Sequence, residues 1–305
     1  MATSEPLNLR KLGSETRKII NAQPRNFFTL SFLFLIPSTI ALLLYPSDRS
    51  LFPDTNNNQP VNGTPTKTLS PFLPIYVLNL FFYLCAVGSI TYTAFHGFSG
   101  ETIKHKSAIK SISSSFFPLL VTTLIAKIIA VTIALILSFL ATFGFLLVSG
   151  FRIELFSSPY FVGFIIALMV FMVLYLQVNW ALALVVVVVE STWGFDALKR
   201  SKTLIKGKRG LALSLYLIFG FVYGVYGWSN YYIYGGADDW KRLWLLSTLQ
   251  VLFNSGFLSL VQLYNITATT VLYGYCKDNH DQKEFSGYQY VSLLVDYDEK
   301  DVDVV

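Results

Sequence analysis

The sequence predicts an all-α fold, a polytopic bundle of six transmembrane helices joined by amphipathic cytoplasmic connectors. Three observations support this prediction. The 305 residues are 53% hydrophobic and only 13% charged, with a mean hydropathy of +0.53, whereas soluble domains carry about 25% charged residues. Six apolar runs are each long enough to cross a bilayer as a helix. Lysine and arginine gather between alternate runs.

The apolar runs also define the predicted domains. Residues 1–25 form a polar cytoplasmic arm, residues 26–276 form the membrane domain, and residues 277–305 form an acidic cytoplasmic tail that is expected to be disordered because it has few apolar residues. The third run has no strong turn signal, so we expect one long helix there. The six predicted spans lie at about 27–45, 71–95, 116–148, 160–189, 211–228 and 245–275.

The distribution of cations predicts the topology and the partners. If both termini are cytoplasmic, the cytoplasmic segments hold 17 lysine and arginine residues and the outer loops hold 5, which is the pattern of the positive-inside rule. The cationic residues that give the chain its net charge of +5 lie beside apolar runs. Anionic lipid headgroups, rather than nucleic acid, are therefore the expected partners. The expected location is the plasma membrane or the endomembrane system.

Residues 190–209, called the basic connector from here on, carry the densest cluster of cations. We predict a short helix that Ser191 or Thr192 caps and Gly207 closes. Such a helix, with tryptophan at one end, would lie among headgroups; a solvated loop that obeys the positive-inside rule is the simpler alternative. The candidate residues for binding lipid or a partner are Trp193, Lys199, Arg200, Lys202, Lys206, Lys208 and Arg209.

The connector also carries a family resemblance. Its segment ALKRSKTLIKG, residues 197–207, follows a span that ends in Glu190 and resembles the plant six-span membrane proteins of unknown function. More distantly, the chain is similar to the YciC-like and glycerophosphodiester phosphodiesterase membrane-domain superfamily over about residues 20–276. The resemblance implies the membrane architecture and not phosphodiesterase activity, because those enzymes carry their acidic metal ligands on a separate soluble domain. Its most specific positions are Ala197, Ser201, Leu204, Lys206 and Gly207.

Catalytic motifs are missing from the sequence. The three histidines show no metal-ligand spacing, and neither a nucleophile elbow nor a phosphate-binding glycine loop is present. We therefore expect a protein that is not an enzyme and that uses no metal and no cofactor.

Polar side chains inside the predicted spans are the remaining candidates, since such groups are costly in a bilayer and are often functional. Lys127 lies in the third span, where it either snorkels to the headgroups or serves a function within the membrane. In the sixth span, four amides fall within a third of the helix circumference, either as interhelical hydrogen bonds or as the lining of a substrate path. These amides, called the amide stripe below, are Gln250, Asn254, Gln262 and Asn265.

Two short motifs suggest processing and sorting. Asn62 begins an Asn-Gly-Thr glycosylation motif in a predicted outer loop, although Pro65 and the nearby span disfavour its use. Tyr290 and Leu293 belong to a Tyr-x-x-Φ sequence in the tail that trafficking adaptors would read. Such short motifs also arise by chance.

Two functions are consistent with these features. The first is a non-enzymatic membrane scaffold or regulator whose basic connector works at anionic lipid. The alternative is a carrier or channel for a small or lipid-like solute, with the amide stripe lining its path.

Overall fold

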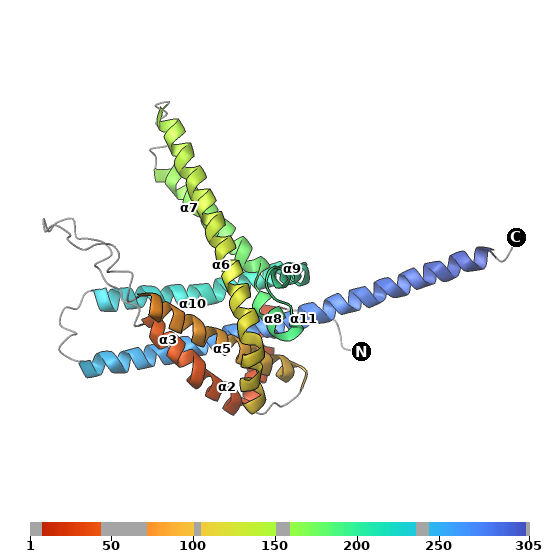
Figure 1. The fold of residues 1–305 in the computed structure, drawn as a ribbon, viewed down its shortest axis with the longest axis horizontal. Coiled ribbons are helices and arrows are strands. Elements are labelled where there is room, and N and C mark those ends of the chain that lie inside the picture. Colours follow the sequence, from red (N-terminus) through yellow and green to blue (C-terminus); the bar gives the residue numbers. More distant parts are fainter. Residues whose placement is uncertain (1–7, 44–71, 101–104, 151–158, 236–243, 303–305) are drawn as a thin grey trace. The chain divides into compact units, whose positions relative to one another are not determined.

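The computed structural model describes residues 8–43, 72–100, 105–150, 159–235 and 244–302. Every regular element within these residues is a helix, which confirms the all-α prediction. The elements are α1 (Leu9–Ala22), α2 (Pro24–Leu30), η1 (Ser31–Leu35), α3 (Ile36–Leu43), α5 (Phe72–Phe98), α6 (His105–Gly150), α7 (Pro159–Asn179), α8 (Ala183–Glu190), α9 (Phe195–Leu204), α10 (Arg209–Gly235) and α11 (Trp244–Val302), as Figure 1 shows.

Four stretches of helix are long and apolar enough to cross a membrane, which indicates a membrane protein. They correspond to the second to fifth predicted spans. Large apolar side chains are exposed along them; Phe221, for example, is 73% exposed. An apolar surface of this kind is unfavourable in water and suits contact with lipid. The four stretches are Leu73–Phe98, Ser115–Leu140, Ile166–Glu190 and Arg209–Ser229.

The first predicted span is divided into three short helices, α2, η1 and α3. The middle one, η1, is a π-helix, in which the N–H of Ile36 reaches the carbonyl of Ser31, five residues back. Pro37 follows directly and has no N–H to bond the carbonyl of Leu33. The proline therefore gives a physical reason for the wider turn.

The chain divides into two compact units. Unit 1 comprises residues 1–13, 121–216 and 269–305, and unit 2 comprises residues 14–120 and 217–268. In unit 2, α2, η1 and α3 pack along α5. The polar arm, for which the sequence predicted no conformation, contains the amphipathic helix α1 at residues 9–22. A Cβ on Gly97 would lie 3.1 Å from the buried Ile19 side chain of α1, so glycine permits this close approach.

Three long helical predictions have different outcomes. Helix α6 runs unbroken from His105 to Gly150, which confirms one long helix for the third run. The fourth predicted span is instead broken, because α7 ends at Asn179 and α8 begins at Ala183. Helix α11 continues through Val302, where the sequence predicts disorder. The tail contains no proline, and extending an existing helix is easier than nucleating a new one.

Candidate functional site

The basic connector of unit 1 forms the short helix α9, and the predicted helix is thus confirmed. Its predicted cap is wrong. Ser191, with φ of 56°, is the C-cap of α8, and Gly194, with φ of 71° and ψ of −136°, is the N-cap of α9. That backbone conformation is essentially restricted to glycine, because any Cβ would be strained there. The chain therefore turns from α8 into α9 at Gly194.

The start of α9 is attached to α6. The backbone N–H of Gly194 donates a hydrogen bond to Thr122 Oγ1 at 2.8 Å. Both residues are buried, so this bond satisfies an amide that has no partner within α9.

The middle of α9 is attached to the break between α7 and α8. Ser201 Oγ donates to the carbonyl of Asn179 at 2.9 Å and accepts the N–H of Leu182 at 3.2 Å. In an unbroken helix these two backbone groups would bond residues four positions away. Here the N–H of Ala183 bonds the carbonyl of Trp180 instead. Ser201 thus supplies the hydrogen bonds that the break removes.

A third attachment joins α9 to α8 and α11. Arg200 Nε lies 3.1 Å from Glu190 Oε2, and the hydroxyl of Tyr273 donates to Glu190 Oε1 at 2.8 Å. The Glu190 side chain is 14% exposed and that of Arg200 is 35% exposed, while Tyr273 is fully buried. Both carboxylate oxygens thus have a partner, as a largely buried carboxylate requires. The structure pairs Arg200, a predicted lipid-binding residue, within the chain, where it positions α9.

These attachments fix which face of α9 is exposed. Ala197, Leu198 and Leu204 are buried together with Ser201. The opposite face presents Lys199 and Lys202 beside Phe195, which is 65% exposed, and Trp193, just before the helix, is 56% exposed. The exposed cations of the connector are Lys199, Lys202, Lys206 and Arg209.

The charges on this exposed face have few partners. Within the described part of the chain, the structure forms no ion pair to Lys199, Lys202 or Lys206. The exposed carboxylate of Asp196 lies at the start of the same helix, where the helix dipole favours it. Lys208 is half-buried, and its charge acts on Cys276. The connector therefore offers a fixed set of free cations between two candidate spans.

The amide stripe lies in unit 2 and is partly engaged in helix packing. Asn265 of α11 is hydrogen-bonded to Tyr223 of α10. Thr39 Oγ1 of α3 similarly donates to the carbonyl of Ser255 on α11 at 3.2 Å. Gln262 Oε1 is buried and has no hydrogen-bond partner among the described residues. Gln250 and Asn254 are half-buried.

The remaining predicted residues are placed as follows. Lys127 lies in unit 1, exposed on α6. Tyr290 and Leu293 lie on α11 in a part whose side chains are outside the described residues, and Asn62 is outside the described residues altogether. Within the described residues, no three histidine, cysteine, aspartate or glutamate side chains gather as metal ligands.

Thr122, Asn179 and Tyr273 are important to the connector but carry no recognisable signal in the sequence. Thr122 acts through a hydroxyl of the kind that usually bonds its own helix, and Asn179 acts through its backbone carbonyl, which every residue has. Their roles appear only when the partner segments are brought together, since Tyr273 lies 83 residues from Glu190.

Together, the apolar helices and the tethered basic helix indicate an all-helical membrane protein with a fixed cationic connector between two candidate spans. Residues 11–288 match the model of the family described as a domain of unknown function, DUF8558. The chain belongs to this family. Comparisons with curated proteins and with solved structures gave no match.

Proposed function

We propose that this chain is a non-enzymatic integral membrane protein that works as a scaffold or regulator, with its basic connector lying on anionic headgroups. In this proposal the membrane domain has six spans and both termini are cytoplasmic. Residues 24–43 supply the first span, since 20 helical residues cover about 30 Å, and the first half of α11 supplies the sixth. The protein resides in the plasma membrane or the endomembrane system.

The observation that carries this proposal is the rigid presentation of α9. A loop that served only to set topology would need its positive charge but no fixed conformation. Here hydrogen bonds hold α9 to α6, to the α7–α8 break and, through Glu190, to α11. This arrangement keeps Trp193 and Phe195 exposed beside lysines. Aromatic rings and cations on one exposed face suit the headgroup region of a membrane.

Charge arithmetic supports a measurable interaction. A lysine or arginine near an anionic membrane surface contributes about 1 kcal/mol at physiological salt. The four exposed cations of the connector would then contribute about 3–4 kcal/mol if all reached the surface. Because these charges are exposed, added salt should weaken the interaction.

The depth of Phe195 in the membrane tests the proposal. Phe195→Cys, in a chain whose buried Cys85 and Cys276 are replaced by alanine, accepts a nitroxide spin label at the exposed site. In nanodiscs with anionic lipid we expect the label to meet oxygen more often than a water-soluble nickel chelate. The same label in a chain with Lys199, Lys202 and Lys206 changed to glutamine is the matched control, and it should become more accessible to the nickel chelate. Equal accessibility in both chains, with anionic and zwitterionic lipid alike, contradicts the proposal.

A second experiment tests the scaffold or regulator role. Native mass spectrometry of the chain released gently from its own membrane would show a stoichiometric protein partner. That partner should be lost when Lys199, Lys202 and Lys206 are changed to glutamine, or when the tail is removed. A partner-free chain in all preparations contradicts this role.

The alternative function, a carrier or channel, is favoured by Gln262, whose buried Oε1 has no hydrogen-bond partner among the described residues. Changing Gln250, Asn254 and Asn265 to leucine separates the two functions. A retained small molecule that disappears from a still-folded variant supports the carrier. Loss of stability alone indicates that the amides hold helices together, as the Tyr223–Asn265 hydrogen bond does.

A further inference from the structure

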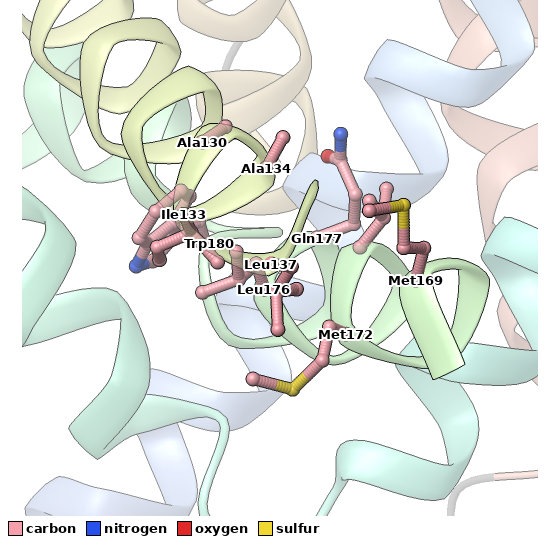
Figure 2. Close-up of a pocket in the computed structure, with 10 residues that line it drawn as sticks. Ala130, Ile133, Ala134, Leu137, Met169, Met172, Leu176, Gln177 and Trp180 are labelled. Carbon is pink, nitrogen blue, oxygen red and sulfur yellow. The ribbon is translucent and has the colours of Figure 1, made fainter. Parts of the chain in front are cut away.

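A cavity of about 80 Å³ lies between α6 and α7 in unit 1. This volume is several times the roughly 15 Å³ that one water molecule needs. Figure 2 shows Ala130 and Ala134 of α6 on one wall, with Trp180 and Met169 toward opposite ends. Met172 of α7 also lines it. The two alanines leave the space that larger side chains would fill. Because the lining is almost entirely apolar, the cavity suits a hydrocarbon group better than water.

The walls of the cavity extend along much of one bilayer leaflet. The lining residues of α6 extend from Ala130 to Leu137, about 10 Å at 1.5 Å per residue, and those of α7 and the turn after it extend from Met169 to Trp180, about 16 Å. Half of a ~30 Å hydrocarbon core is about 15 Å. Both walls belong to helices that contain candidate spans, Ser115–Leu140 and Ile166–Glu190. The hydrogen bond between Thr122 and Gly194 places residue 122 of α6 at the level of the connector, so Lys127 lies about 8 Å along the helix from that level. A single acyl chain from one leaflet therefore matches this cavity, called the α6–α7 groove from here on, in length and in polarity.

One end of the groove, at Trp180, is polar. Trp180 provides an indole N–H there, whereas the Gln177 amide lies on the side of Met169 in Figure 2. Lys127 precedes Ala130 by three residues and Ala134 by seven, so it lies on the same stripe of α6, one turn beyond the groove. Helical side chains lean toward the N-terminus of their helix, so that of Lys127 leans away from the apolar part.

The polar end also lies on the connector side. Trp180 is in the turn between α7 and α8, next to Asn179, whose carbonyl accepts the hydrogen bond from Ser201 of α9. Lys127 is exposed and makes no ion pair within the described part of the chain. An exposed lysine inside an apolar stretch is costly unless an anion or the membrane surface receives it.

We propose that the α6–α7 groove binds one anionic phospholipid, with an acyl chain between the helices and its phosphate on Lys127. The site differs from the exposed face of α9, which meets many headgroups at once, because it holds a single molecule by both ends. It rests on the proposed function only in its orientation, with the connector among the headgroups.

Occupancy is tested by native mass spectrometry of the full chain released from nanodiscs that contain phosphatidylglycerol and phosphatidylcholine. Ala134→Phe fills the groove and should lower the retained phospholipid about tenfold. Ile128→Phe is the matched control, because Ile128 is 63% exposed and points to the other side of α6. Lys127→Gln should retain lipid but lose its preference for phosphatidylglycerol. Equal retention by Ala134→Phe and Ile128→Phe overturns the proposal.

A measurement on the unaltered chain covers the case in which Ala134→Phe fails to fold. Phosphatidylglycerol with a diazirine in its acyl chain should photolabel Met169 or Met172, which line the groove. If labelling instead follows surface exposure, so that Phe171, which is 67% exposed, is labelled and the methionines are not, the proposal of a lipid in the groove is overturned. Labelling of the methionines in a chain whose Phe195 spin label stays in water would separate the groove from the proposed role of the connector.

Discussion

Ser201→Ala is the most direct test of how the connector is held. The substitution removes one oxygen atom from a fully buried site. It takes away the donor to the carbonyl of Asn179 and the acceptor of the N–H of Leu182. Leu182 is itself fully buried, so water cannot readily replace the lost partner. A buried polar group left without a partner costs about 1–3 kcal/mol, so the two groups together predict a loss of about 2–6 kcal/mol.

The loss is measured by unfolding in mixed micelles with a rising fraction of denaturing detergent, followed by circular dichroism. Thr203→Ala is the matched control, because Thr203 is exposed on the same helix and bonds only the carbonyl of Lys199. We expect the control to change stability by less than about 0.5 kcal/mol. If Ser201→Ala costs no more than the control, Ser201 does not stabilise the break, and our account of the α7–α8 junction is refuted.

Three further predictions concern the surroundings of the connector. Tyr273→Phe should lower the free energy of unfolding by about 1.5–3 kcal/mol, since it removes a hydrogen bond to a largely buried carboxylate. In a Glu190→Gln background the same substitution should cost clearly less, as a double-mutant cycle would show. Additive costs contradict the coupling of Tyr273 to Glu190. Gly194→Ala should lower the midpoint of thermal unfolding through its positive φ, whereas Gly210→Ala in α10 should not; equal midpoints contradict the strain. Burial raises the pKa of the Cys276 thiol to about 11, and the charge of Lys208 partly offsets this rise. The alkylation rate of Cys276 in the native chain should therefore rise tenfold per pH unit from pH 8 toward pH 11, whereas the rate in the denatured chain should level off near pH 9. A native rate that levels off near pH 9 contradicts the burial of this thiol.

Properties that depend on local sequence were predictable. The lengths of apolar runs predict the four helical stretches that are long and apolar enough to cross a membrane, and the absence of turn signals predicts that α6 is unbroken. The amphipathic helix α1 was also within reach, because Leu12, Thr16 and Ile19 follow helical spacing and are buried. Because the overall hydrophobicity of α1 is low, a search for apolar runs does not detect it.

The break between α7 and α8 was not predictable, and the reason is physical. Residues 178–182 contain neither glycine nor proline, so nothing local predicts an interruption. The hydrogen bonds that stabilise the break come from Ser201, which lies 22 residues after Asn179. The same holds for Thr122 and Gly194, which lie 72 residues apart. The predicted cap at Ser191 or Thr192 was wrong for this reason, since the N-cap at Gly194 is held by Thr122 of a helix remote in sequence.

The dependence of the break on Ser201 has a consequence for how the chain is made. When residues 159–190 leave the ribosome, their apolar character favours one continuous helix, because each backbone group then finds its partner four residues away. Ser201 emerges only later and can then take over the carbonyl of Asn179 and the N–H of Leu182. We therefore expect residues 159–190 to enter the membrane as one unbroken helix. The break at residues 180–182 forms only when α9 docks, so a broken helix shows that the connector has been completed.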